Sequence, residues 1–215
     1  MINRVYAMDV SVLEDREVYE RVYAFVGGER RRKAEFFRFG KDRRLSLGAG
    51  YLLLRGATRL GLDAPEIAVG EHGKPYFAGA EGVHFNLSHS GRLAVCAFSD
   101  RPVGIDAEEL REFDEKLIRQ VFTADEERAL AAHGCTPALC TRLWTVKESL
   151  MKYLGTGMTL DPRDIFADPI EPRLISAAGY DISDLHLTCF EAAGCAVTIC
   201  SGYERFAEGL EWVKP

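Results

Sequence analysis

The chain has 215 residues, of which 47% are hydrophobic and 28% are charged, a composition typical of a globular protein with one large domain or two small ones. Its formal net charge of −6 argues against general nucleic-acid binding, and its most apolar helical stretch is too short and polar to cross a membrane. The N-terminus lacks the apolar run of a signal peptide and the six cysteines form no Cys-x-x-Cys pair, so we expect free thiols in a reducing cytoplasm.

Hydrophobic patterning divides the chain into two series of elements with a similar order. The first series predicts a strand at residues 1–10, helices at 11–26, 29–39 and 42–61, and strands at 66–70, 83–88 and 93–99. After the Asp100-Arg101-Pro102 break, the second series predicts a strand at 103–108, helices at 113–121, 124–133 and 137–154, and strands at 165–167, 185–191 and 196–200. This repetition favours a division near Pro102 and leaves an internal duplication open.

Residues 29–44 form a basic segment in an otherwise acidic chain. They hold eight lysine and arginine residues against three acidic ones, a local charge of +5. A compact basic segment of this kind suits a small polyanion better than a long one. A solvated, charged helix face explains the same pattern equally well.

Residues 144–157 carry an acid and a base at helical spacing. Glu148 and Lys152 lie four residues apart, so they share one face of the predicted helix, and Gly155 is a suitable residue to end it. An acid and a base on one face, followed by Gly155-x-Gly157, suit a site that holds a metal ion and a phosphate together. The alternative is that Glu148 and Lys152 form a solvated surface pair, which is the usual arrangement at this spacing.

A second pair of acidic residues ends a predicted strand. Asp106 and Glu108 are two residues apart, so both side chains point to one face. Two neighbouring carboxylates repel each other unless a cation or water relieves them, and oxygen ligands of this type suit Mg²⁺. The alternative is an exposed strand end that continues into an acidic loop.

Two short segments add candidate anion-binding groups. His89 lies in a Ser/Gly-rich turn after a strand, where it can donate to a bound anion. A hydrolase Ser/His pair is a weaker interpretation because the sequence has no Gly-x-Ser-x-Gly elbow, and a turn-stabilising histidine is common. Lys74 precedes Pro75, which biases it towards extended geometry, although Gly73-Lys74-Pro75 also fits a simple turn.

Taken in this order, these segments resemble 4′-phosphopantetheinyl transferases of the two-lobed Sfp type. The matching pieces span about residues 30–157. They are the basic segment, Gly73-Lys74-Pro75, Phe85-Asn86-Leu87-Ser88-His89-Ser90, Val103-Gly104-Ile105-Asp106-Ala107-Glu108, Phe122-Thr123-Ala124-Asp125-Glu126, and Trp144-x-x-Lys147-Glu148-Ser149-x-x-Lys152 with Gly155-x-Gly157. The Gly-Ile-Asp-x-Glu and Trp-x-x-Lys-Glu segments at this separation are the specific part of the resemblance.

The resemblance implies an α+β fold, a monomeric pseudo-dimer of two similar lobes at residues 1–102 and 103–215, with the active site in the cleft between them. It implies transfer of the 4′-phosphopantetheine group of coenzyme A to a serine hydroxyl of an apo acyl or peptidyl carrier protein. The reaction would depend on Mg²⁺ and release adenosine 3′,5′-bisphosphate. The carriers of such enzymes serve fatty-acid, polyketide or non-ribosomal peptide synthesis.

The resemblance also assigns roles to individual residues. It implies Mg²⁺ ligands at Asp106, Glu108 and Glu148, phosphate contacts from His89 and Lys152, a coenzyme pocket lined by Lys74, Pro75 and Ser88, and 3′-phosphate contacts from Arg32, Lys33 and Arg44. Asp106, Glu148 and Lys152 would be catalytic. Glu148 is the candidate base for the serine proton, directly or through water, as well as a metal ligand.

Two other functions use the same residues. A magnesium-dependent pyrophosphohydrolase acting on coenzyme A or a nucleotide would use the same carboxylates with water as acceptor. A non-catalytic carrier-protein binding module would bind without turnover. The segment at 111–128 lies between the two acidic motifs and is a candidate carrier rim, although its own acidic residues weigh against an electrostatic docking surface.

Overall fold

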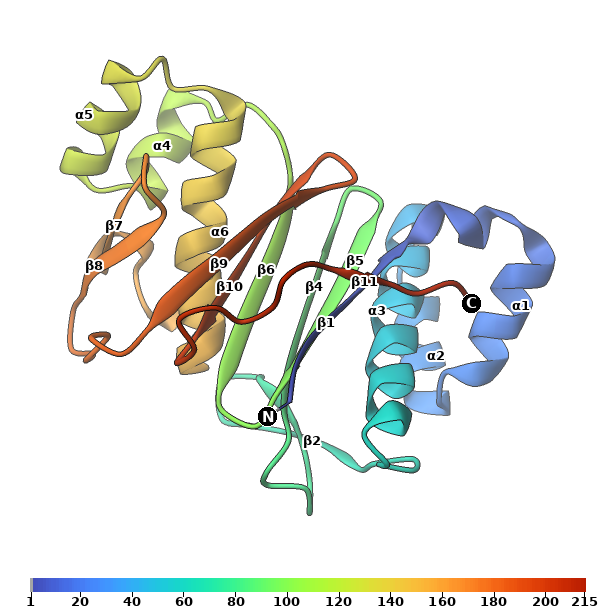
Figure 1. The fold of residues 1–215 in the computed structure, drawn as a ribbon. Helices are drawn as coiled ribbons and strands as arrows, with labels where there is room; N and C mark the ends of the chain where they lie inside the picture. Colours follow the sequence, from blue (N-terminus) through green and yellow to red (C-terminus); the bar gives the residue numbers. More distant parts are fainter. Residues whose placement is uncertain (1) are drawn as a thin grey trace.

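The computed structural model describes residues 2–215, and its two halves repeat one order of elements (Figure 1). The first half holds β1 (Asn3–Asp9), η1 (Val10–Glu14), α1 (Arg16–Phe25), α2 (Gly28–Glu35), α3 (Gly40–Arg59), β2 (Ile67–Val69), β3 (Pro75–Phe77), β4 (His84–Ser90) and β5 (Leu93–Ser99). The second holds β6 (Val103–Glu109), α4 (Glu115–Val121), α5 (Ala124–Ala132), α6 (Pro137–Leu154), η2 (Gly157–Thr159), η3 (Pro162–Asp164), β7 (Ile165–Asp168), β8 (Arg173–Ala177), β9 (His186–Ala192), β10 (Cys195–Ser201) and β11 (Glu211–Trp212). Among the described residues, no helix is long and apolar enough to cross a membrane.

The two main sheets share one topology. The first has the order β11-β1-β5-β4 and the second the order β6-β10-β9. β5 pairs antiparallel with β1 and β4, and β10 pairs antiparallel with β6 and β9 in the same way. Each half also inserts a short hairpin, β2–β3 or β7–β8, after its long helix. The predicted α+β pseudo-dimer of two similar lobes is thus confirmed.

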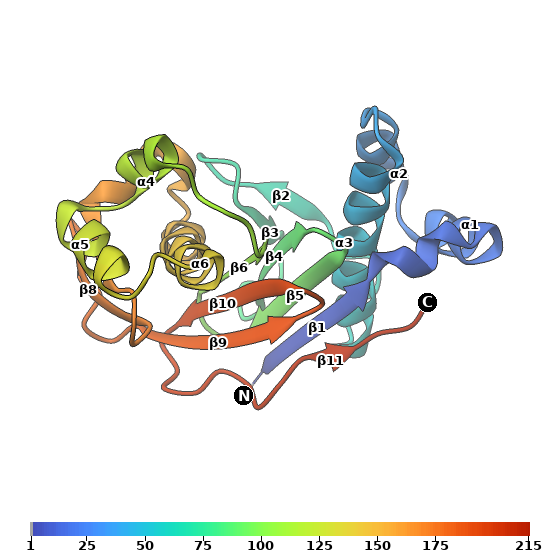
Figure 2. The ribbon, with the colours of Figure 1, turned by 90° about the horizontal axis from the view of Figure 1, so that it is seen from above.

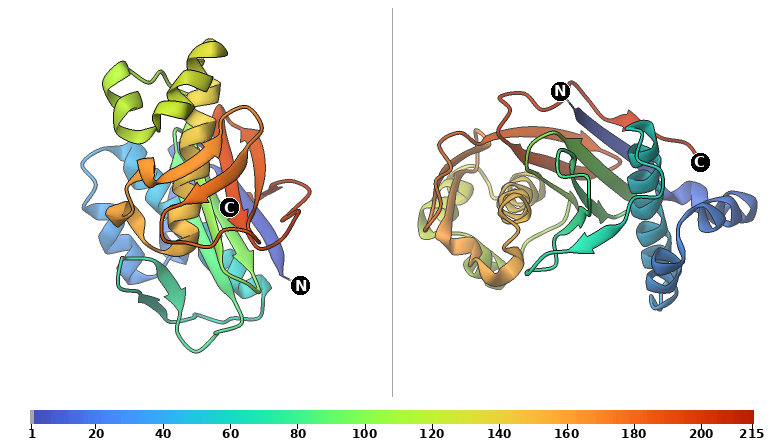
Figure 3. Two further views of the ribbon diagram at one scale, coloured as in Figure 1. Left: turned by 90° about the vertical axis from the view of Figure 1, so that its left-hand side faces the viewer. Right: turned by 90° about the horizontal axis from the view of Figure 1, so that it is seen from below.

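The order of layers is α6, the second sheet, the first sheet and α3, and α4, α5 and the β7–β8 hairpin lie beyond α6 (Figure 2 and Figure 3). Strict alternation along β1 explains this arrangement: Val5 and Ala7 join the apolar core between the sheets, whereas Tyr6 and Met8 join the core under α3. Strands that are buried on both faces therefore read as continuous apolar runs, as in Leu93–Ser99.

The last strand returns to the first lobe. β11 pairs in parallel with β1 through Tyr6 and Ala7, so the C-terminal segment covers part of the edge of the first sheet. The division of the chain at residues 102 and 103 stays a proposal, and under that division the second unit lends a strand to the first.

The predicted elements differ from the observed ones mainly at their ends. The helix predicted from residue 11 begins at Arg16, because the Asp15 side chain accepts the Val18 N–H and caps it there. The N-cap predicted at Thr123 is present, and Glu126 completes a capping box. The strands β3, β8 and β11 were not predicted from the sequence, since all three are short and carry exposed residues.

A buried ion pair joins three elements of the second half. Lys147 Nζ lies 2.6 Å from Glu126 Oε2, and both side chains are 0% exposed. The same ammonium donates to the carbonyl oxygens of Val121, Pro162 and Ile165. The other oxygen of Glu126 accepts the backbone N–H of Ala167. Lys147 therefore belongs to the core that anchors α6, although its motif neighbour Glu148 faces the candidate site.

We expect Lys147→Ala to lower the free energy of unfolding by about 3–5 kcal/mol, because it leaves the Glu126 carboxylate buried without its cation. Urea denaturation followed by circular dichroism measures the change. The matched control is Arg119→Ala, which breaks an exposed pair with Glu115 and should cost less than about 1 kcal/mol. Equal losses in the two variants would contradict the assigned role of the buried pair.

Candidate active site

The candidate site lies where β4 of the first half meets β6 of the second. The two strands belong to different sheets and are joined by side chains instead of a ladder. Asn86 Oδ1 accepts the Ile105 N–H at 2.9 Å, and Ser90 Oγ accepts the Glu109 N–H at 3.0 Å. Alternation along β4 places polar residues 86, 88 and 90 on the side that faces β6. We call this junction the β4–β6 seam.

Asp106 is the centre of the seam. It is 3% exposed, and its Oδ1 accepts hydrogen bonds from Ser88 Oγ at 2.9 Å and from Lys152 Nζ at 2.6 Å. Its Oδ2 is buried and has no hydrogen-bond partner among the described residues. Asp106 and Lys152, two separately predicted site residues, are therefore in direct contact, and one carboxylate oxygen of Asp106 remains available.

Glu108 and Glu148 complete a cluster of three carboxylates around the seam. Burial raises the pKa of Glu148 to about 7; the charges of Asp106 and Glu108 also raise it, whereas Lys152 lowers it. Burial likewise raises the pKa of Glu108, against a hydrogen bond from Ser90 Oγ at 2.9 Å. Within residues 2–215, however, no three acidic, histidine or cysteine side chains converge as a formed metal site.

A close backbone contact sets the distance between α6 and the seam. A Cβ atom at Gly104 would lie 2.0 Å from the carbonyl oxygen of Ser149 and 2.4 Å from the backbone nitrogen of Tyr153. Only glycine lets α6 lie directly on β6, and this contact directs Glu148 and Lys152 towards Asp106. As predicted, α6 ends at Gly155, which has a left-handed conformation with φ of 74°.

Lys74 reaches the seam from the β2–β3 hairpin. Its Nζ donates to the carbonyl oxygens of Tyr153 at 2.9 Å and Val103 at 3.2 Å, and burial lowers its pKa to about 8. The ammonium thus joins the end of α6 to the start of β6. The neighbouring Pro75 is half-buried and begins β3.

The basic segment contributes two cations to the vicinity of His89. His89 keeps an exposed edge, but the atoms packed around its ring lower its pKa, and the charges of Lys152, Arg30 and Lys33 lower it further. Lys33 is among the residues predicted from the sequence to contact the 3′-phosphate, and Arg30 is not. The signal for Arg30 was its spacing, three residues before Lys33 on α2, which puts both on one helix face.

The other two predicted 3′-phosphate residues lie differently. Arg44 Nη2 donates to Glu14 Oε1 at 3.0 Å, and Arg32 is exposed on α2. Arg30 packs closely against Gly50 of α3. A Cβ atom at Gly50 would lie only 2.6 Å from Arg30 Cγ. Arg30 and Lys33 are therefore the cations of this segment whose charges act on His89.

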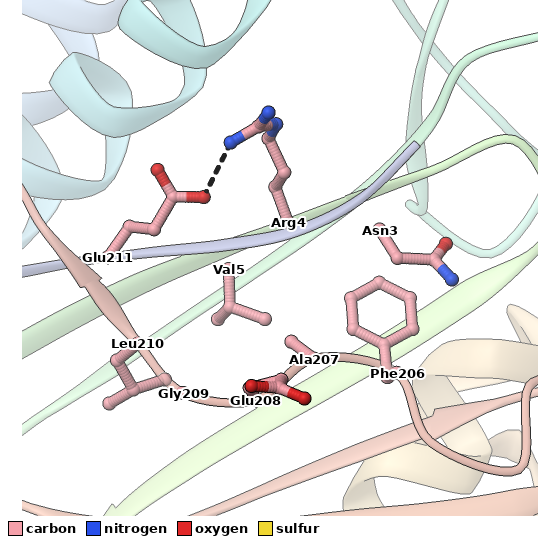
Figure 4. A pocket seen from close by; sticks show the side chains of 9 residues that line it. All are labelled: Asn3, Arg4, Val5, Phe206, Ala207, Glu208, Gly209, Leu210 and Glu211. Atoms are coloured by element: carbon pink, nitrogen blue, oxygen red, sulfur yellow. Dashed lines mark hydrogen bonds and ion pairs between the residues drawn. The ribbon is translucent and has the colours of Figure 1, made fainter. Parts of the chain in front are cut away.

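A cavity of about 620 Å³ lies away from the seam, between Asn3–Val5 of β1 and residues 206–211 (Figure 4). An ion pair between Arg4 and Glu211 crosses it at 2.8 Å. None of the predicted site residues lines this cavity. It reflects the incomplete cover that the C-terminal segment gives to β1.

Comparison with known proteins gives a consistent set of matches. Residues 102–200 match the family model described as the 4′-phosphopantetheinyl transferase superfamily. The chain is 32% identical over 205 residues to a 4′-phosphopantetheinyl transferase of Bacillus subtilis, covering 89% of each chain. It is 28% identical over 222 residues to the 4′-phosphopantetheinyl transferase Sfp of Bacillus subtilis, covering 98% of this chain and 97% of the relative. The 4′-phosphopantetheinyl transferase psf-1 of Bacillus pumilus is 34% identical over 165 residues, covering 73% of this chain and 70% of the relative.

We expect Gly104→Ala to lower the free energy of unfolding by about 3 kcal/mol, because the new methyl group meets backbone atoms that cannot move aside independently. Thermal and urea denaturation measure the loss. Gly82→Ala is the matched control, since a Cβ atom at that position would have nothing within 4 Å and the change should cost less than about 1 kcal/mol. Unchanged stability in Gly104→Ala would show that α6 does not depend on this contact.

Proposed function

Because the chain belongs to the 4′-phosphopantetheinyl transferase superfamily and is an enzyme of that class, we propose that it takes the 4′-phosphopantetheine group from coenzyme A. The acceptor is a serine hydroxyl of an apo acyl or peptidyl carrier protein, and the other product is adenosine 3′,5′-bisphosphate. The observation that carries this proposal is the seam cluster, in which Lys152 Nζ, Ser88 Oγ and a free carboxylate oxygen meet at Asp106.

We propose that the seam holds a divalent cation. Asp106 Oδ2 is buried without a partner, and the neighbouring carboxylates of Glu108 and Glu148 raise the electrostatic cost of leaving it so. Oxygen donors of this kind suit Mg²⁺, so we assign Asp106, Glu108 and Glu148 to hold it. When bound, the ion supplies charge neutralisation for the pyrophosphate and the departing phosphate.

The cations of the seam are placed to hold the phosphates of the coenzyme. Lys152 is partly exposed and contacts Ser88 as well as Asp106, so its ammonium can be shared between the carboxylate and a phosphate oxygen. We propose that His89, Arg30 and Lys33 bind the 3′-phosphate, because the charges of Arg30 and Lys33 both act at the His89 ring. Arg32 and Arg44 stay predictions for the same role.

We assign the remaining residues to two tasks, which are to position the coenzyme and to accept the proton of the attacking serine. Lys74 donates to carbonyl oxygens of β6 and α6, so we assign it and Pro75 to the wall of the coenzyme pocket. A base must accept the proton of the attacking serine, and we propose the Glu148 carboxylate, directly or through water. Since the two halves of one chain supply both sides of the seam, a monomer suffices for the reaction.

We expect Asp106→Asn to reduce transfer at least about 100-fold, because it removes charge from the centre of the site at nearly constant shape. The readout is the intact mass of an apo carrier protein after incubation with coenzyme A and Mg²⁺, with an EDTA control. The wild-type protein should add one phosphopantetheine group, and EDTA should prevent it.

Other outcomes of this experiment reject parts of the proposal. If Asp106→Asn transfers phosphopantetheine as fast as the wild-type protein, the assignment of Asp106 as a metal ligand is wrong. Cleavage of coenzyme A without carrier modification identifies a pyrophosphohydrolase. Binding of coenzyme A and carrier without any turnover identifies a binding module.

We expect Lys152→Ala to raise the dissociation constant for coenzyme A about tenfold, because it removes a charge-assisted contact to phosphate, while carrier binding changes less. Isothermal titration calorimetry measures both affinities. Lys214→Ala, at an exposed position after β11, is the control and should change neither. A larger loss of carrier affinity than of coenzyme affinity would contradict the phosphate role.

A further inference from the structure

The loop between α2 and α3 exposes two aromatic rings. Phe36 is 90% exposed and Phe39 is 63% exposed, whereas Phe37 between them is half-buried. The loop is held in this form: the Phe37 N–H donates to the Ala34 carbonyl at 3.2 Å, and Arg43 Nη2 donates to the Phe37 carbonyl at 3.2 Å. Large apolar side chains gathered on an exposed loop mark a candidate interaction surface.

This loop borders the seam. Lys41, in the first turn of α3, lies 3.6 Å from Glu109, the residue after the proposed metal ligand Glu108. Seen from above, α2 and α3 stand on one side of β4 and β6, and α4 and α6 stand on the other (Figure 2). A protein that presents a side chain to the seam therefore passes between these two sides.

The charge around the two rings is positive. The loop lies within the segment of local charge +5, in a chain whose net charge is −6. The Arg38 guanidinium lies 5.6 Å from the centre of the Phe39 ring, which keeps a cation beside the apolar surface. Aromatic anchors flanked by cations match a partner surface that offers an apolar pocket within an acidic rim.

We propose that Phe36 and Phe39, flanked by Arg38 and Lys41, form the first-lobe half of the docking surface for an acidic acceptor carrier protein. This rests on the proposed function, which requires a macromolecular acceptor at the seam. A protein pocket can enclose a ring that its own chain leaves 90% uncovered. Small-molecule sites are concave and bury most of their ligand, whereas this ring protrudes. A small coenzyme would therefore cover one side of the ring at most.

The test uses the double variant Phe36→Ser/Phe39→Ser and steady-state transfer with several apo acyl and peptidyl carrier proteins. We expect KM for the carrier that the wild-type protein modifies to rise at least about tenfold, because two aromatic anchors are lost. KM for coenzyme A and kcat at saturating carrier should stay within about twofold. Arg38→Glu should raise KM for the carrier as well and weaken its dependence on salt.

The matched control removes exposed apolar surface elsewhere. Ile175 and Trp212 are 43% and 53% exposed and lie on β8 and β11, so Ile175→Ser/Trp212→Ser should leave KM for the carrier unchanged. Melting temperatures of all variants establish that each is folded. An equal rise of KM in the control variant would overturn the proposal, because the effect would then be general.

Other results also overturn it and leave the proposed function standing. An unchanged KM for the carrier in Phe36→Ser/Phe39→Ser, with normal transfer by the wild-type protein, removes the docking surface alone. A rise confined to KM for coenzyme A reassigns the rings to the coenzyme. Sedimentation of the wild-type protein, but not the variant, with phosphatidylglycerol vesicles reassigns them to an anionic membrane.

Discussion

The direct contact between α6 and β6 governs the rest of the site. At Gly104 the backbone of the strand meets the backbone of the helix, so there is no layer of side chains between them. Asp106 lies on the strand just beyond this contact, and Glu148 and Lys152 lie on the helix around it. The short separation brings oppositely charged groups into hydrogen-bond distance in a largely buried place, where their interactions are strong.

The seam is held by contacts from both halves of the chain. Serine and asparagine side chains of β4 take the place of a sheet ladder, and Lys74 ties the hairpin of the first half to the end of α6. Such contacts are individually weaker than a continuous ladder. They join the lobes while leaving polar groups of the junction within reach of a ligand, and the buried Lys147 pair anchors α6 to α5 and β7.

Simple periodicities predicted much of this arrangement. Spacing of two on a strand and of four on a helix correctly grouped Asp106 with Glu108 and Glu148 with Lys152, because neither requires long-range information.

The sequence could not show that Lys147 turns into the core, because its partners lie on α5 and around β7. The sequence could not show the position of Arg30 for a similar reason, because this position depends on contact with Gly50 of α3. Lys74 was placed near the site, but its direction towards carbonyl oxygens follows only from the packing of two lobes. The short strands β8 and β11 exist through pairing, which a local pattern does not record.

The return of β11 to β1 bears on how the chain folds as it is made. β1 is the first strand of the sequence and β11 the last, and the two pair side by side. During synthesis, the outer edge of β1 therefore keeps unpaired backbone groups until β11 emerges. An open strand edge is a template for association with other chains. The nascent first lobe thus presents this edge to other chains until the last strand of the described chain emerges and covers part of it.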